Sequence, residues 1–116
     1  MYWDSILQSI KKLLGIPEED EAFDAELTAH INGVFMTLQQ LGVGSNSGFF
    51  ISGPTEIWSD FSDNGNLIDS VRMFIYLKVR MIFDPPTSSA AAEAINSRIA
   101  ELEFRLNVQA EGDAES

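Results

Sequence analysis

Side chains able to do acid–base or nucleophilic chemistry are few in this chain, and they form no recognisable catalytic set. Its 116 residues include no cysteine and one histidine, His30. Without cysteine there are no disulfides and no thiolate metal ligands, and a single imidazole rules out most histidine-based metal sites. A Ser-His-Asp arrangement through His30 is formally possible, but no nucleophile-elbow sequence accompanies it. We therefore predict that His30 is a packing or surface residue, and that the protein is not an enzyme.

Carboxylates are abundant, but they stand where solvation and helix electrostatics explain them. The chain has 18 acidic residues, and the acidic run 18–21 precedes a helical pattern. Acids there stabilise a helix N-terminus, whereas a calcium loop needs alternating acids around a glycine. The glycines of Gly42–Pro54 are not followed by the Gly-Lys-Ser/Thr of a phosphate-binding loop. The sequence therefore predicts no metal site and no cofactor.

The charge balance restricts the kinds of partner. With only seven lysines and arginines, the formal net charge is −11 at pH 7. Tight binding of nucleic acid is unexpected, because cationic side chains must displace counterions from the phosphates. A wall that DNA passes without sticking, by contrast, is expected to be anionic.

Three cations interrupt the most apolar segment, Leu67–Phe83: Arg72, Lys78 and Arg80. At 100° per residue, Arg72 and Lys78 lie about 600° apart and face different directions, as do Lys78 and Arg80. They are therefore not expected to form one basic stripe. Either each reaches solvent or pairs with an acid from a neighbouring helix, or they pair with acids of an adjacent subunit.

The spacing of apolar residues predicts an all-α fold, a small bundle of four main helices plus one short helix. The main helices are expected at 4–14, at about 22–41, from near Asn66 to Phe83, and from Ser88 or Ser89 to about Val108. A short helix is expected at 55–61. The expected N-caps or first-turn residues of their helices are Asp4, Thr55, Asn66 and either Ser88 or Ser89. Residues 1–110 are predicted to form a single domain, and 111–116 a disordered acidic tail.

The central helix is apolar on nearly every side, so most of its surface must be buried. Either the other helices of this short chain wrap it, or another subunit helps. The last helix carries a narrow seam at alternating four-and-three spacing, formed by Ile95, Ile99, Leu102 and Leu106.

The segment Gly42–Pro54 is a long connection, and such loops are often functional or mobile. It contains Phe49, Phe50 and Ile51, which need a dry environment. Two interpretations remain open. These residues could tuck back onto the helices as a short β-like cover, or dock on a neighbouring chain.

No targeting or membrane segment is expected. The first residues lack the basic start and cleavage site of a signal peptide, and the apolar segment 67–83 carries too much charge to span a bilayer. An intracellular, soluble protein is the simplest prediction.

Several segments resemble the small head–tail connector (adaptor, or neck) proteins of long-tailed bacteriophages. They are FDAELTAHINGVFMTLQQLGVG, GFFISGPTEIWSDF, LIDSVRMFIYLKVRMIFDPP and the closing ELEFRLNVQ. The resemblance covers about Gly15 to Gln109, and IYLKVRMIFDPP and FRLN are its most specific parts.

The resemblance implies a helical subunit of a homo-oligomeric ring, commonly of about a dozen copies, beneath the portal protein. Such a ring extends the channel through which DNA passes, and it is a platform for a downstream neck or tail protein. It would lie in the virion, after assembly in the host cytoplasm. No catalytic residue and no cofactor are implied.

Head-to-tail ring contacts need two different patches on each subunit. We hypothesise that the loop and the short helix supply one patch and the outer faces of the long helices the other. The candidate interface residues are Phe49, Phe50, Ile51, Trp58, Arg72, Lys78 and Arg80. The alternative function is a helical protein-binding module that acts as a dimer, with the seam at Ile95–Leu106 used as a two-helix zipper.

Overall fold

The computed structural model describes residues 4–44 and 48–115, and within these ranges its secondary-structure elements are all helices, joined by turns and irregular segments. The helices are α1 (Ile6–Leu14), α2 (Asp24–Gln40), α3 (Trp58–Phe61), α4 (Gly65–Phe83) and α5 (Ser89–Glu115). No strand is present in the described ranges, and the isolated bridge found there, between Ser5 and Ile57, lies outside the loop in which a β-like segment was expected. The predicted all-α bundle of four main helices and a short one is confirmed.

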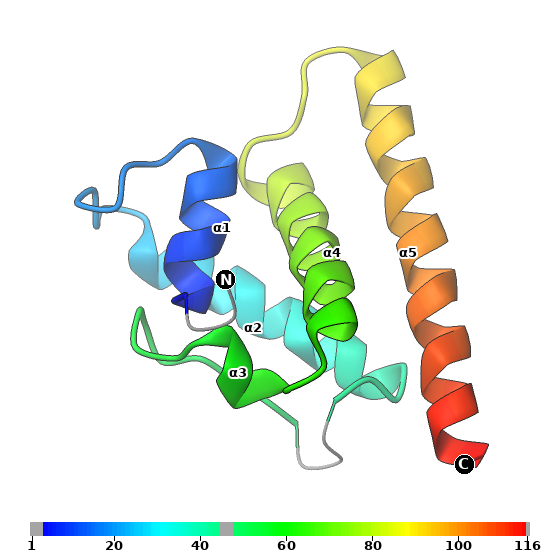
Figure 1. Ribbon diagram of the computed structural model, residues 1–116. Coiled ribbons are helices and arrows are strands. Elements are labelled where there is room, and N and C mark those ends of the chain that lie inside the picture. Colours follow the sequence, from blue (N-terminus) through cyan, green and yellow to red (C-terminus); the bar gives the residue numbers. More distant parts are fainter. Residues whose placement is uncertain (1–3, 45–47, 116) are drawn as a thin grey trace.

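Helix α4 occupies the middle of the molecule. Helices α1 and α5 lie on either side of it and α2 crosses behind (Figure 1). The packed pairs agree with this view: α4 contacts α1, α2 and α5, and α1 also contacts α2. The long helix α5 packs chiefly on α4. The other helices therefore bury most of the apolar surface of α4, which was the first of the two expectations.

One core joins all the helices. Its fully buried members come from successive helical turns, as the apolar spacing predicted. They include Ile6, Leu7 and Ile10 of α1, Leu27, Ile31 and Leu38 of α2, Trp58 of α3, and Ile68, Val71, Phe74, Ile75 and Val79 of α4. From α5, Leu102 and Leu106 are almost completely buried, and Ile95 and Ile99 pack against the same core. The seam is thus used inside the subunit.

At three of the helices, the residue that caps the N-terminus lies one or two positions from the residue expected. The Ser5 hydroxyl accepts from Gln8 N and caps α1 in place of Asp4, and the Asn64 side chain accepts from Leu67 N and caps α4 in place of Asn66. Thr55 does not cap α3, where the Asp60 carboxylate accepts from Ile57 N instead. Only the start of α5 has its expected cap, as Ser88 Oγ accepts from Ala91 N.

Helix α5 is longer than expected. It runs to Glu115 rather than ending near Val108, so neither Gly112 nor the acids around it end the helix. The helical trace of 111–115 therefore differs from the disordered acidic tail expected there. That disorder, like the single-domain assignment of 1–110, stays a prediction about the protein in solution.

Candidate subunit interface

The loop after α2 lies back on its own subunit at two of the three apolar residues 49–51. Ile51 is 4% exposed, and the Asn32 side chain donates to its carbonyl at 2.9 Å and accepts from its N–H at 2.8 Å. Phe49 packs edge-on against Phe35 and Phe61, with ring centroids 5.0 and 5.5 Å apart. Phe50, between them, is 51% exposed. The tucked interpretation therefore describes Phe49 and Ile51, and Phe50 alone faces outward.

Trp58 is a core residue rather than a surface residue. Its side chain is fully buried, and its indole Nε1 donates to Ser9 Oγ at 3.0 Å. The guanidinium of Arg72 stacks over the ring with its Cζ 5.2 Å from the centroid. Trp58 and Ile51 have no exposed surface to offer a neighbour, so the structure does not bring the seven candidate residues onto one face.

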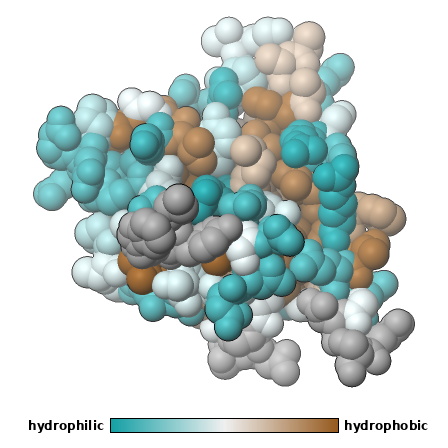
Figure 2. Space-filling model, in the orientation of Figure 1, coloured by the Kyte–Doolittle hydropathy of each residue, from teal (hydrophilic) through white to brown (hydrophobic). Residues whose placement is uncertain are grey.

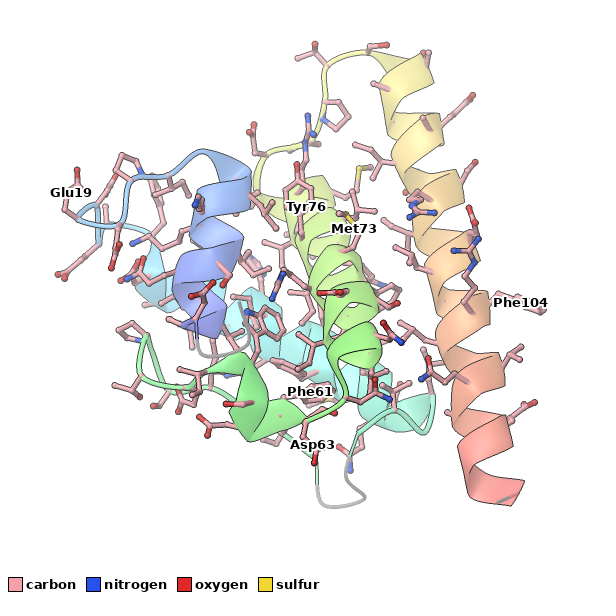
Figure 3. The ribbon with its side chains drawn as sticks, viewed as in Figure 1. Glu19, Phe61, Asp63, Met73, Tyr76 and Phe104 are labelled. Carbon is pink, nitrogen blue, oxygen red and sulfur yellow. The ribbon has the colours of Figure 1, made fainter. Side chains whose placement is uncertain are left out.

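The cations of α4 are arranged in a way that the sequence argument missed. Arg72 and Arg80 are eight residues apart, about 800° of helical rotation, so only about 80° separates their directions. Tyr76 lies between them, and its hydroxyl accepts from Arg80 Nη1 at 3.3 Å. We call Arg72, Tyr76 and Arg80, with the neighbouring Met73, the α4 face. Figure 3 shows Tyr76 and Met73 on the side of α4 turned toward the viewer.

None of the three cations is neutralised by another helix within the described residues. Arg72 Nη1 lies 3.8 Å from Asp69 Oδ1 on its own helix, while its Nε and Nη2 are buried without a hydrogen-bond partner. Lys78 Nζ sits over the ring of Phe74, 5.6 Å from its centroid. Pairing with acids of neighbouring helices is therefore not what the structure shows, and the adjacent-subunit alternative stays open.

Lys11 is a structural site that sequence reasoning missed. Its side chain is fully buried, and Nζ donates to the carbonyls of Glu18 and Asp20 at 3.0 and 2.7 Å. The same Nζ lies 2.9 Å from Asp24 Oδ1 at the start of α2. The acidic run at 18–21 thus contributes carbonyl oxygens, not carboxylates, to a cation that the chain itself supplies. The signal available in the sequence was an amphipathic helix with lysine at a core position.

Apolar side chains remain exposed on other faces of the bundle, and Figure 2 shows brown surface along α4 and α5. The most exposed is Phe104 at 70%, with Val108 one turn later at 49%. Phe104 lies about 200° from both Leu102 and Leu106, directly opposite the buried seam. We call Phe104 and Val108, together with Glu93 and Glu111 on the same side of the helix, the outer face of α5. Met36, Phe50 and Ile82 are also more than half exposed.

No described cluster suggests chemistry. An open hollow of about 770 Å³ lies between α1, the loop after it and Arg72, lined by charges of both signs such as Asp4, Lys12 and Glu18. In the described ranges no three His, Cys, Asp or Glu side chains are grouped as metal ligands. His30 sits on α2 beside Glu26, with 3.9 Å between Nε2 and Oε1. No helix of these ranges is long and apolar enough to cross a membrane.

Glu56 is the charged group most closely tied to the loop. Its Oε2 accepts from Ser52 N at 3.0 Å and from Ser52 Oγ at 2.8 Å. Partial desolvation acts to raise the pKa of this carboxyl, but the hydrogen bonds from Ser52 and from the backbone N–H groups of Glu56 and Gly53 together outweigh it, and the pKa is lowered. Glu56 therefore holds the end of the loop most firmly when ionised.

Comparison with known proteins gives one match. A family model described as "Phage connector protein" matches residues 6–113, which takes in α1 to α4 and almost all of α5. No curated protein and no solved structure matches the chain.

Proposed function

Because the chain belongs to the phage connector protein family, we propose that its copies form a closed ring between the portal protein and the tail. The ring extends the DNA channel and serves as the platform on which a downstream neck or tail protein assembles. It forms in the host cytoplasm and remains in the neck of the virion, with about a dozen copies per ring. DNA passes through it without specific binding.

The observation that carries the proposal is the extent of the family match. It covers residues 6–113, so the whole helical subunit is the matched unit. Exposed apolar residues on more than one face support self-assembly. Phe104 points away from α4 at the edge of the molecule (Figure 3), while Phe50 belongs to the loop that runs over α2. Contacts between two different patches close into a ring when the rotation between copies permits.

The rival function, a dimeric helical binding module, needs a free seam on α5. Leu102 and Leu106 are 4% and 1% exposed because they pack into the subunit's own core. A two-helix zipper through this seam would have to pull α5 away from α4 and expose both surfaces. This favours the ring over the dimer.

The proposal assigns no catalysis to the protein. The family is that of a structural connector, and the hollow beside Arg72 is lined by charges of both signs, among them Asp4, Lys12 and Glu18.

The decisive experiment mixes the purified protein with the portal protein and with candidate downstream neck proteins. Light scattering after size-exclusion chromatography gives the mass, and electron microscopy of the particles gives the shape. We expect closed rings, alone or seated on the portal. A stable dimer that ignores the portal would reject the proposal and favour the binding module.

A further inference from the structure

Helix α4 presents a surface whose composition differs from that of the rest of the molecule. In a chain with a net charge of −11, residues 70–83 contain three cations and no acid. Of the α4 face, Met73 is exposed and Arg72, Tyr76 and Arg80 are partly exposed. Arg, Tyr and Met are the residue types enriched in the cores of protein–protein interfaces, where Glu, Asp and Lys are depleted. This face therefore has the composition of a contact surface.

The remaining cations of the chain are mostly engaged elsewhere. Lys11 is enclosed by two carbonyls and the Asp24 carboxylate. Arg98 and Arg105 both pair with Glu101 on α5, Arg98 at 3.4 Å. The α4 face thus holds cations that no acid of another helix neutralises among the described residues. Its natural counterpart is an acidic surface with an apolar centre.

The same chain carries such a surface on α5. Phe104 and Val108 are 70% and 49% exposed. At 100° per residue, Glu93 and Glu111 point within about 20° of the direction of Phe104 around the axis of α5. Both of these acids are exposed, and no cation lies on that line, since Arg98 and Arg105 are rotated about 100° or more to one side.

We propose that the α4 face of one copy binds the outer face of α5 of the next copy. This inference rests on the ring proposed above and names its two surfaces. Phe104 packs against Met73 and Tyr76, and the guanidinium group of Arg80 faces Glu111 of the neighbouring α5. Arg72 stays stacked on Trp58 of its own subunit and adds positive charge beside the contact. Buried arginine and aromatic anchors are what usually dominate the binding energy of an interface.

The two surfaces point in different directions on one subunit. Figure 3 shows Tyr76 and Met73 turned toward the viewer and Phe104 directed away at the edge beyond α5. One copy can therefore use both at once, each toward a different neighbour, as a head-to-tail ring requires. A two-fold contact of α5 with α5 would instead bring Glu93 and Glu111 against like charges.

Site-directed cross-linking tests the pairing directly, because the wild-type chain has no cysteine. Met73→Cys and Phe104→Cys variants are mixed in equal amounts under conditions in which the wild type forms rings, and a short bismaleimide is added. We expect a cross-linked dimer from the mixture and none from either variant alone. Ser59→Cys on the exposed side of α3 replaces Met73→Cys as the matched control and should give no dimer with Phe104→Cys.

Each outcome has a distinct meaning. The pairing would be overturned, and the ring left intact, by any of three results. The first is ring formation without cross-linking between the Met73→Cys and Phe104→Cys variants. The others are equal cross-linking by the Ser59→Cys control and a cross-linked homodimer of the Phe104→Cys variant. Failure of the wild type to form rings even with the portal protein would overturn the proposed function and the pairing with it.

Charge and shape variants provide the second test. Arg80→Glu and Phe104→Asp should each raise the protein concentration needed for ring assembly by about tenfold or more. Mixed together they should form dimers but no larger species, because each retains one intact surface. Circular dichroism should give wild-type helix content for both. Ring assembly by either variant at the wild-type concentration would contradict the pairing.

Discussion

At the scale of single residues, Lys11 does most to fix the path of the chain between α1 and α2. A lysine is almost never fully buried unless paired, and here one ammonium group satisfies two carbonyls and a carboxylate. Apolar contacts hold the two ends of the segment 15–23, because Ile16 packs against the core and Phe23 contacts Phe83 edge-on. The cation holds the acidic stretch between them, which has no apolar side chains to bury.

Replacing Lys11 with Met should lower the free energy of unfolding by about 3–5 kcal/mol, since the Asp24 carboxylate loses its buried partner and two carbonyls lose a donor. Urea denaturation followed by circular dichroism measures the change. Lys12→Met is the matched control, one residue along and exposed, and it should change stability by no more than about 0.5 kcal/mol. Equal effects of the two substitutions would show that the buried ammonium is not special.

Glu56 gives the loop a dependence on pH. Its pKa in the folded protein lies below the ordinary value of 4.5, so its contribution is present above pH 4.5 and is lost as the pH falls through the folded pKa. Glu56→Gln should reduce stability at neutral pH and make the unfolding free energy fall less between about pH 5 and about pH 3. Denaturation at several pH values checks this. If the unfolding free energy of the variant depends on pH as that of the wild type does, ionised Glu56 and its hydrogen bonds from Ser52 are not the cause of that dependence.

At the scale of secondary-structure elements, the sequence was most informative where apolar periodicity was strong. The positions of α1, α2, α4 and the start of α5 followed from it, because buried faces repeat with the helical period. What it could not give was the direction of the loop. The path of the loop depends on residues of other elements: the Asn32 side chain on α2 holds the backbone of Ile51. Phe49 turns inward onto the rings of Phe35 and Phe61.

The candidate interface was less predictable for a related reason. Apolar and aromatic residues in a loop indicate that something must cover them, but not whether the cover comes from the same chain. Trp58 and Ile51 proved to be core residues. The exposure of Phe104 was not predicted, because this residue lies outside the apolar seam, on the opposite side of α5. Arg72 and Arg80 share a face of the helix because eight residues are close to a whole number of turns. Comparing each of them only with Lys78, as in the sequence analysis above, does not reveal this.

The structure separates the roles of the paired phenylalanines. Phe49→Ser should lower the unfolding free energy by about 2 kcal/mol, because it removes a ring from the cluster with Phe35 and Phe61. Phe50→Ser should leave stability within about 0.5 kcal/mol, since its side chain is half exposed. Thermal unfolding of the two variants measures the difference. Similar losses would mean that Phe50 is also part of the core in solution.

At the scale of the whole molecule, the subunit has a complete core and yet exposes apolar groups on several faces. The core explains how one chain of this size folds by itself. Exposed apolar surface with polar rims is typical of interaction sites. A subunit that is folded but incompletely covered therefore fits the proposed ring, in which neighbouring copies would cover these groups.

The net charge of −11 leads to the last prediction, which concerns DNA. A channel that conducts DNA should repel phosphates, and the cations that could bind them are, in our proposal, covered by the next subunit. We expect a short duplex to bind more weakly than about 100 µM at physiological salt, by fluorescence anisotropy, below the usual range of non-specific affinity. Arg80→Glu should leave this result unchanged. Micromolar binding that disappears in Arg80→Glu would instead assign the α4 face to DNA, because loss on reversing a single charge identifies the groups that contact the phosphates.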